Sequence, residues 1–204
     1  MVQTIQARDI TLHELETRFG LTLVEDEQFF REWQDNLPDI TASEKQQLDR
    51  VKANYTNLIK YPPLLENTVK MVVLSPLLDL ANFYQTPPIK SEVPVEISAE
   101  DEGIIIKGQI DVLVLKEQLW ILVIDSKKAA FSIEVGLAQI LTYMLGNPTL
   151  DSPSFGMITT GGSFIFIKLL KGTSQYATSR VFELRNPGND LYSVLGILKR
   201  LTSF

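Results

Sequence analysis

The sequence predicts a mixed α/β protein in which helices flank a mixed central sheet. Three observations carry this prediction. Helix signals dominate the first part of the chain, three strand-like segments follow one another in its middle, and one helical segment separates them from two further strand-like segments. Three strands before a helical crossover indicate a meander, and the helix before the fourth strand indicates a mixed sheet with helices on its faces.

Helix signals come first along the chain. Residues 11–18 and 26–35 are expected to form helices. A longer helix is expected over residues 41–60, because Thr41 and Glu44 have the spacing of a capping box.

Two proline pairs divide the middle of the chain. Pro62 and Pro63 end the preceding helix, since proline lacks a backbone N–H and disrupts a helix interior. A second helix is expected from residue 64 to residue 74 or beyond, with its apolar residues on one face. After the second proline pair, residues 92–97 alternate in the manner of a strand.

The strand-rich part of the chain follows. Residues 104–115 and 119–125 are expected to be neighbouring strands joined by a short turn. The second of them is apolar and β-branched, so it is expected to be central in the sheet. The remaining expected elements are a helix over 133–145, a hairpin of 155–160 and 163–170 with a Gly-Gly turn, a strand over 176–184 and a helix over 189–201.

The length of 204 residues is that of one domain, or of one domain with an appendage. We expect residues 1–60 to form a helical region packed on a core that spans residues 61–204. The chain has no cysteine and a single histidine, His13. This composition excludes disulfide bridges, thiolate zinc sites, cysteine nucleophiles and multi-histidine metal sites. Carboxylates, lysines and hydroxyls are left for catalysis, with a hard metal ion as their partner.

The formal net charge of −6 argues against a protein that coats nucleic acid non-specifically. The charge is uneven, because residues 1–119 hold 11 basic and 20 acidic residues, whereas residues 120–204 hold 8 basic and 5 acidic residues. A polyanion is able to approach the second part, although uneven solvated faces explain the imbalance equally well. The longest apolar run is six residues, far below the ~20 of a membrane helix. With no visible signal peptide, we expect a cytoplasmic protein without a membrane partner.

Two carboxylates and one lysine stand out on the two neighbouring strands. Asp111 lies near the end of the first strand, and Asp125 and Lys127 end the second. Asp125 and Lys127 are two residues apart, so they face the same side of an extended chain. If the intervening turn makes the strands neighbours, both carboxylates meet at one region of the sheet. The alternative is structural, with Asp125 and Lys127 ending a buried strand and Asp111 pairing with a nearby base.

This combination of side chains suits phosphodiester hydrolysis. Carboxylate oxygens bind the hard cations Mg²⁺ and Mn²⁺. Such an ion lowers the pKa of bound water and stabilises charge on phosphoryl oxygens. A lysine positions the attacking water and offsets the developing negative charge. No histidine or cysteine is required, in agreement with the composition.

The same residues resemble the PD-(D/E)XK nuclease superfamily, the restriction-endonuclease-like proteins. The segment Gly108-Gln-Ile-Asp111 resembles the strand that carries the family's first metal-binding aspartate. The segment Asp125-Ser126-Lys127 resembles the family's second acid and its lysine. The proline that names the motif is absent before the first aspartate, and the second acid is aspartate rather than the commoner glutamate.

Two further features extend the resemblance to about residues 60–170. Gln139 and Tyr143 match the Gln-x-x-x-Tyr motif that follows the catalytic lysine in RecB-like nucleases and in the nuclease domain of type I restriction motor subunits. Glu66 resembles the additional acidic residue on the family's first helix. Packing within the helix is the alternative for the glutamine and tyrosine, and an exposed pair with Lys70 is the alternative for Glu66.

The resemblance implies a restriction-endonuclease-like αβββαβ core and a role for each of these side chains. Asp111, Asp125 and Lys127 would be catalytic, with Lys127 orienting the nucleophilic water. Gln139 and Tyr143 would contact the substrate or the lysine. The implied ligands of Mg²⁺ or Mn²⁺ are Glu66, Asp111, Asp125 and the carbonyl of Ser126.

The expected function is therefore that of a metal-dependent nuclease acting on DNA. A non-catalytic DNA-binding or assembly module of the same fold is the main alternative, and the net acidity favours it modestly. A helical interaction protein whose site residues are only structural is the third. A homodimer or partner subunits remain open, because the sequence contains no separate recognition domain.

Overall fold

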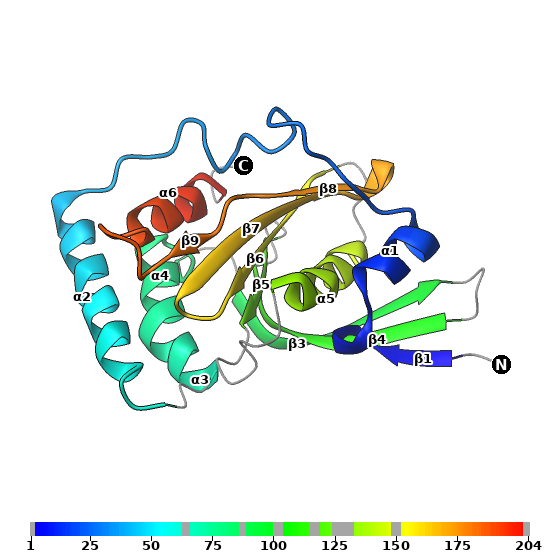
Figure 1. The fold of residues 1–204 in the computed structure, drawn as a ribbon, viewed down its shortest axis with the longest axis horizontal. Helices are drawn as coiled ribbons and strands as arrows, with labels where there is room; N and C mark the ends of the chain where they lie inside the picture. Colours follow the sequence, from blue (N-terminus) through cyan, green and yellow to red (C-terminus); the bar gives the residue numbers. More distant parts are fainter. Residues whose placement is uncertain are drawn as a thin grey trace.

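The computed structural model describes residues 3–62, 66–85, 89–99, 104–114, 119–123, 133–147 and 152–201. Within the three middle strands and at the start of the following helix, some residues are described by their backbone alone. Figure 1 shows the arrangement: a long, bent sheet crosses the molecule, with helices packed along it.

The described strands form one nine-stranded sheet in the order β1-β4-β5-β6-β7-β8-β2, with β3 on β4 and β9 on β7. Pairing is parallel for β1 with β4, for β5 with β6 and for β2 with β8, and antiparallel elsewhere. The bounds are β1 Gln3–Gln6, β2 Thr22–Leu23, β3 Ile89–Ala99, β4 Ile104–Val114, β5 Leu119–Val123, β6 Ser154–Thr159, β7 Ser163–Leu170, β8 Gln175–Thr178 and β9 Phe182–Glu183.

The helices account for most of the rest of the described chain. The α-helices are α1 Leu12–Phe19, α2 Ala42–Leu58, α3 Glu66–Val69, α4 Ser75–Leu80, α5 Ile133–Leu145 and α6 Leu191–Leu201. A π-helical turn, η2 Lys70–Leu74, joins α3 to α4, and the short 3-10 helices are η1 Ala7–Asp9 and η5 Lys171–Thr173. No helix in the described ranges is long and apolar enough to cross a membrane.

The mixed α/β class predicted from the sequence is confirmed. The meander is present, because β3 pairs antiparallel with β4 and β4 pairs antiparallel with β5. Helix α5 then carries the chain to β6, which is parallel to β5. The Gly-Gly hairpin of β6 and β7 and the closing helix α6 also form as predicted.

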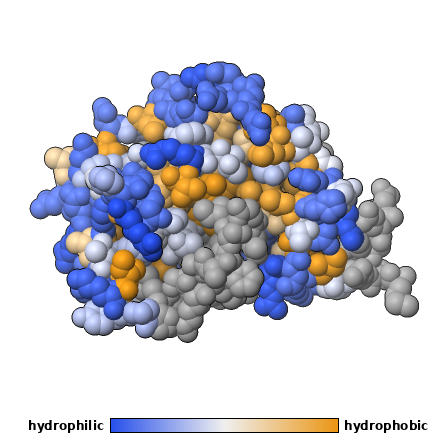
Figure 2. Space-filling view, in the orientation of Figure 1, coloured by the Kyte–Doolittle hydropathy of each residue, from blue (hydrophilic) through white to orange (hydrophobic). Residues whose placement is uncertain are grey.

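Two apolar clusters cover the two faces of the central strands. On β7, Phe164 and Phe166 belong to one cluster, whereas Ile165 and Ile167 belong to the other. We call these the α6 face, which α2, α3–α4 and α6 cover, and the α5 face, which α5, α1 and η1 cover. Burial on both faces explains why β6 and β7 read as continuous apolar runs. Figure 2 shows apolar residues across the middle of one face of the molecule, between more polar surfaces.

Capping boxes fix two of the helix starts. The Thr41 backbone N–H donates to Glu44 Oε2 at 2.8 Å, and the Glu44 N–H donates back to Thr41 Oγ1 at 3.3 Å. The capping box predicted for this helix is therefore confirmed. Thr11 and Glu14 form the same motif at the start of α1.

A π-helical turn interrupts the helix that was predicted to begin near residue 64. Pro76 lies at the start of α4, directly after η2. Proline has no N–H for the helical hydrogen bond and its ring crowds the preceding turn, so widening of that turn is a recognised accommodation. The helix continues to Leu80, which agrees with the prediction that it extends beyond residue 74.

The helix predicted over residues 26–35 is wrong. This segment forms turns, because the Asp26 carboxylate accepts the Gln28 N–H and Asn36 adopts a left-handed φ of 53°. The Lys168 ammonium also holds the Phe29 carbonyl, at 2.8 Å. In this turn conformation, the Phe30 side chain lies in the core of the α6 face.

The N-terminal part contributes strands that the sequence did not predict. β1 lies beside β4, and β2 lies beside β8, at two separate places in the sheet. The single strand predicted over residues 176–184 is divided into β8 and β9. The predicted division at residue 60 stays a prediction.

Candidate functional site

The predicted catalytic group lies only partly in the described chain. Asp125, Ser126 and Lys127 lie outside the described residues. Asp111 lies in β4 and is described by its backbone alone. Its neighbour Val112 pairs with Ile121 of β5, so the strand with the first aspartate is adjacent to the strand that leads toward the second.

β4 has two partners along the edge that it shares with β5. β1 pairs with it over Ile104–Lys107, and β5 pairs with it over Val112–Val114. In the chain as described, the segment from Gly108 to Asp111 lies between these two pairings. The opposite edge of β4 is covered by β3. The predicted first metal-binding residue therefore lies where β4 passes from one partner strand to another.

Gln139 and Tyr143 meet on one face of α5. The Gln139 Nε2 donates a hydrogen bond to the Tyr143 hydroxyl at 2.8 Å, as the i, i+4 spacing of a helix permits. Tyr143 is 2% exposed, and Gln139 is half-buried. The hydrogen bond offsets the cost of placing the hydroxyl in the protein interior.

The Tyr143 ring lies directly against β4. A Cβ atom built on Gly108 would lie 2.5 Å from Tyr143 Cε1 and 2.7 Å from its hydroxyl oxygen. It would also lie 2.8 Å from the Ala7 Cβ. Only a residue without a side chain permits this approach. The structure thus brings the Gln139–Tyr143 pair to a point three residues before Asp111 on the same strand.

A hollow of about 580 Å³ opens beside this pair. It lies where β1 turns into η1, next to β4, β3 and α5. Its lining consists of Gln6, Ala7, Arg8, Pro94, Lys107, Gly108, Gln139 and Tyr143. Of these, sequence reasoning singled out Gln139 and Tyr143 as site residues and missed Arg8 and Lys107. No motif contains the two cations; only their place in the fold reveals them.

Glu66 forms the ion pair that was the alternative to a metal-binding role. Its Oε1 lies 2.6 Å from the Lys70 ammonium, one turn further along the same helical segment. Within the described ranges, no three acidic or histidine side chains gather as a group for a metal ion. The metal role of Glu66 stays a prediction, because the other proposed ligands are not described as side chains.

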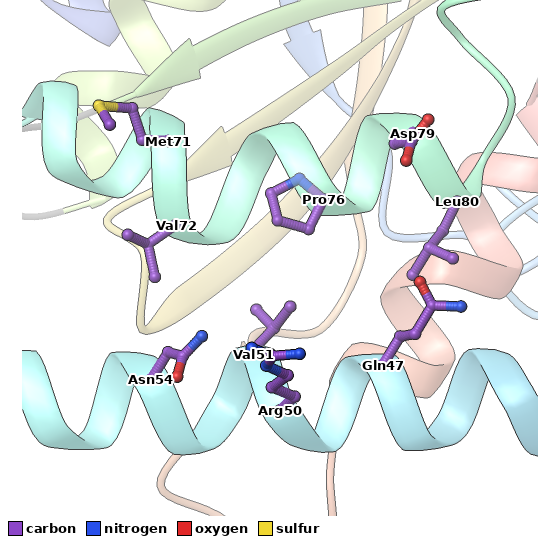
Figure 3. A pocket seen from close by; sticks show the side chains of 9 residues that line it. All are labelled: Gln47, Arg50, Val51, Asn54, Met71, Val72, Pro76, Asp79 and Leu80. Carbon is purple, nitrogen blue, oxygen red and sulfur yellow. The ribbon is translucent and has the colours of Figure 1, made fainter.

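A second hollow, of about 400 Å³, lies on another part of the molecule, between α2 and the α3–α4 segment. Figure 3 shows the two helices side by side, with Gln47, Val51 and Asn54 reaching from α2 toward the other helix. Its lining includes one cation, Arg50, and one carboxylate, Asp79. None of the residues predicted for the site lies in it.

Comparison of the sequence with protein-family models and with curated proteins found no match.

Proposed function

We propose that this protein is a metal-dependent nuclease that hydrolyses phosphodiester bonds in DNA. The proposal places a restriction-endonuclease-like αβββαβ core over the α3–α4 segment, the meander β3–β4–β5, the crossover helix α5 and β6. The order of these elements and the parallel pairing of β5 with β6 support it.

One observation carries the proposal. Gln139 and Tyr143 are hydrogen-bonded to each other, and the Tyr143 ring is packed against Gly108, on the strand that carries Asp111. Packing of a helix on a sheet needs apolar side chains, and burial of a tyrosine hydroxyl costs free energy unless it is bonded. A polar pair at this place supports a role next to a reaction centre.

The donor set consists of oxygens, which fits Mg²⁺ or Mn²⁺. Asp111, Asp125 and the Ser126 carbonyl would hold the ion, and Glu66 would complete the set if its carboxylate left Lys70. A bound ion supplies Lewis acidity toward the phosphoryl group and lowers the pKa of a coordinated water. Lys127 orients the attacking water with its ammonium group. Gln139 and Tyr143 position the substrate beside these side chains.

Cleavage of DNA by the whole protein tests the proposal. Linear and circular DNA are incubated with Mg²⁺ or Mn²⁺, and products are separated by size. Asp111→Asn keeps the shape of the side chain but removes its charge, so we expect cleavage to be at least ~100-fold slower. This loss is at least as large as the loss expected when a residue that only supports a metal ligand is removed. Asp79→Asn, at an exposed position on α4, is the matched control and should cleave at the wild-type rate. Absence of metal-dependent cleavage of every DNA form contradicts the proposal.

A non-catalytic DNA-binding or assembly module of the same fold is the second candidate. The net charge of −6 weakens the attraction of a polyanion, so it modestly favours an assembly role over cleavage of DNA. Titration with Mn²⁺ in a calorimeter separates the two. An intact site binds Mn²⁺ in the wild type and loses it in Asp111→Asn, whereas a decayed site binds none while DNA binding survives the substitution.

A further inference from the structure

We infer that the hollow beside Gln139 and Tyr143 binds the phosphate groups of a nucleic acid strand, with Arg8 and Lys107 as its cationic contacts. The inference deepens the proposed function, on which its choice of substrate rests. It assigns a binding role to the N-terminal segment, which lies outside the part of the chain that resembles nucleases.

The size of the hollow suits a short length of a polymer. Its volume of about 580 Å³ lies within the range of small-ligand sites, roughly 300–1,000 Å³. Four elements form its walls: the end of β1 with η1, the outer strand β3, the strand β4 and the helix α5. It is an open depression, so a chain is able to enter and leave it.

The charge of the lining is positive. Arg8 and Lys107 line the hollow, and none of the eight lining residues that the structure describes is a carboxylate. Their carboxylate partners, Asp9 and Glu96, are not among these lining residues, so the two cations are the charged groups that an anion meets in the described part of the hollow. The hollow between α2 and α4 differs, because Arg50 and Asp79 cancel there.

Both cations are able to reach a ligand. The Arg8 side chain is 71% exposed, and its Nε lies 3.9 Å from the Asp9 carboxylate, a long and weak pair. Lys107 is 49% exposed and lies 3.1 Å from Glu96, its cross-strand partner on β3. Exposed pairs of this kind contribute little to stability. A phosphate group is therefore able to replace the carboxylates as the partner of these cations, or to bind the same cations beside them.

The uncharged part of the lining suits the rest of a nucleotide. Gln139 keeps an amide oxygen and a second N–H beyond its bond to Tyr143, and both can bond to a sugar or a base edge. Gly108 lies three residues from Asp111, which is about 10 Å along an extended strand. Along a DNA duplex, in which each strand rises about 3.4 Å per nucleotide, this distance corresponds to about three steps.

Binding without cleavage tests the inference. The intact protein is titrated in EDTA into a labelled single-stranded oligonucleotide and into the duplex of the same sequence, and fluorescence anisotropy gives the affinity. We expect Arg8→Ala and Lys107→Ala each to weaken binding about 3- to 10-fold. For single strands, the slope of log affinity against log salt should fall by about 0.7 for each lost contact.

Matched substitutions control for the loss of charge. Arg50→Ala and Lys60→Ala remove one arginine and one lysine from exposed positions in or just after α2, which lies at the other end of the molecule (Figure 1). This pair should leave affinity and salt slope unchanged. Glu96→Gln frees Lys107 from its partner and should strengthen binding several-fold, a change of opposite sign.

The outcomes distinguish binding of a nucleic acid strand from binding of inorganic phosphate and from non-specific electrostatic attraction. Affinity that rises with oligonucleotide length and exceeds that of inorganic phosphate supports a strand, whereas equal binding of inorganic phosphate overturns it. The inference also fails if the wild type binds no oligonucleotide, if Arg8→Ala with Lys107→Ala binds as the wild type does, or if the α2 pair loses as much. Circular dichroism and the milder variants Arg8→Gln and Lys107→Gln guard against misfolding.

A failure of this inference can be distinguished from a failure of the proposed function. Binding that depends on Arg8 and Lys107, in a protein that cleaves no DNA, supports the inference and removes the nuclease. Cleavage that depends on Asp111, with binding indifferent to the two cations, supports the nuclease and removes the inference.

Discussion

Helices α5 and α6 pack on opposite faces of the same strands, and they differ in whether they bury polar side chains. The buried residues of α6 are aliphatic apart from one glycine. On α5, Thr142 is 1% exposed and Tyr143 is 2% exposed. The Thr142 hydroxyl is satisfied within the helix by the Ala138 carbonyl at 2.8 Å. Tyr143 instead receives its bond from Gln139, at the side of the hollow.

This difference distinguishes the apolar side chains that stabilise the fold from the polar side chains that a functional site requires. Helix α6 shows that a helix is able to cover its side of these strands with buried aliphatic residues and one glycine. A buried polar pair adds desolvation cost that its hydrogen bond only offsets. The polar pair on α5 therefore marks the face on which we place function, and the α6 face serves as the scaffold.

The largest expected effect comes from the scaffold side. Leu198 of α6 is fully buried. Leu198→Ala removes three buried carbon atoms and leaves a cavity, so the free energy of unfolding should fall by about 2–5 kcal/mol. Urea denaturation measures this change. Oligonucleotide binding by the folded fraction should equal that of the wild type, and a specific loss of binding would show that the α6 face is more than a scaffold.

Substitution of two glycines by alanine gives the next largest effects, and the two substitutions change the free energy of unfolding in opposite directions. Gly108→Ala drives a Cβ to within 2.5 Å of the buried Tyr143 ring, so it should lower the free energy of unfolding by about 1–3 kcal/mol. Gly196→Ala, in the interior of α6, meets nothing closer than 3.7 Å and should raise that free energy by about 0.5–1 kcal/mol.

The glycine comparison also reports on the site. We expect Gly108→Ala to weaken oligonucleotide binding, because it displaces Tyr143, while Gly196→Ala leaves binding unchanged. Denaturation curves and anisotropy titrations on the same preparations measure both properties. If the two substitutions destabilised the protein equally, the close approach of α5 to β4 would have no special consequence.

Local sequence predicted the elements whose signals are local. The capping box at Thr41, the helix over 133–145 and the Gly-Gly hairpin depend on residues close together in the chain, and all three are present. The helix predicted over 26–35 is wrong: the segment forms turns, and a distant side chain, Lys168, binds the Phe29 carbonyl. Apolar spacing alone does not distinguish a helix from turns that bury the same side chains.

The sequence did not predict the contacts between segments that are distant along the chain. Four residues of β1 give too short a pattern to predict a strand, and their pairing with β4 crosses about a hundred positions of the chain. Arg8 joins the hollow only through that pairing. Gln139 and Tyr143 were predicted as a pair from their resemblance to the Gln-x-x-x-Tyr motif, and helical spacing brings them together. The need for Gly108 became visible only with the Tyr143 ring packed against it. The roles of Asp111, Asp125 and Lys127 stay predictions.

The smallest expected effect compares two capping-box carboxylates, one on each side of the sheet. Glu14 starts α1 on the α5 face, and Glu44 starts α2 on the α6 face. Hydrogen bonds from Thr11 lower the pKa of Glu14. The Lys199 ammonium, on α6, is the largest cause that lowers the pKa of Glu44, and bonds from Thr41 add to it.

A lowered pKa in the folded state makes this contribution depend on pH. The unfolded carboxyl titrates near its ordinary value of 4.5, and the folded one titrates below it. The stabilisation by Glu44 is therefore complete above the ordinary value and disappears as the pH falls through the folded pKa. Glu44→Gln should lose less than ~1 kcal/mol at neutral pH, and the difference from wild type should vanish in acid. Glu14→Gln should lose less, with a weaker dependence on salt, because its nearest cation, Arg18, lies 3.9 Å away. Equal losses in the two variants, measured by denaturation across this pH range, would show that the Lys199 contact adds nothing to the cap.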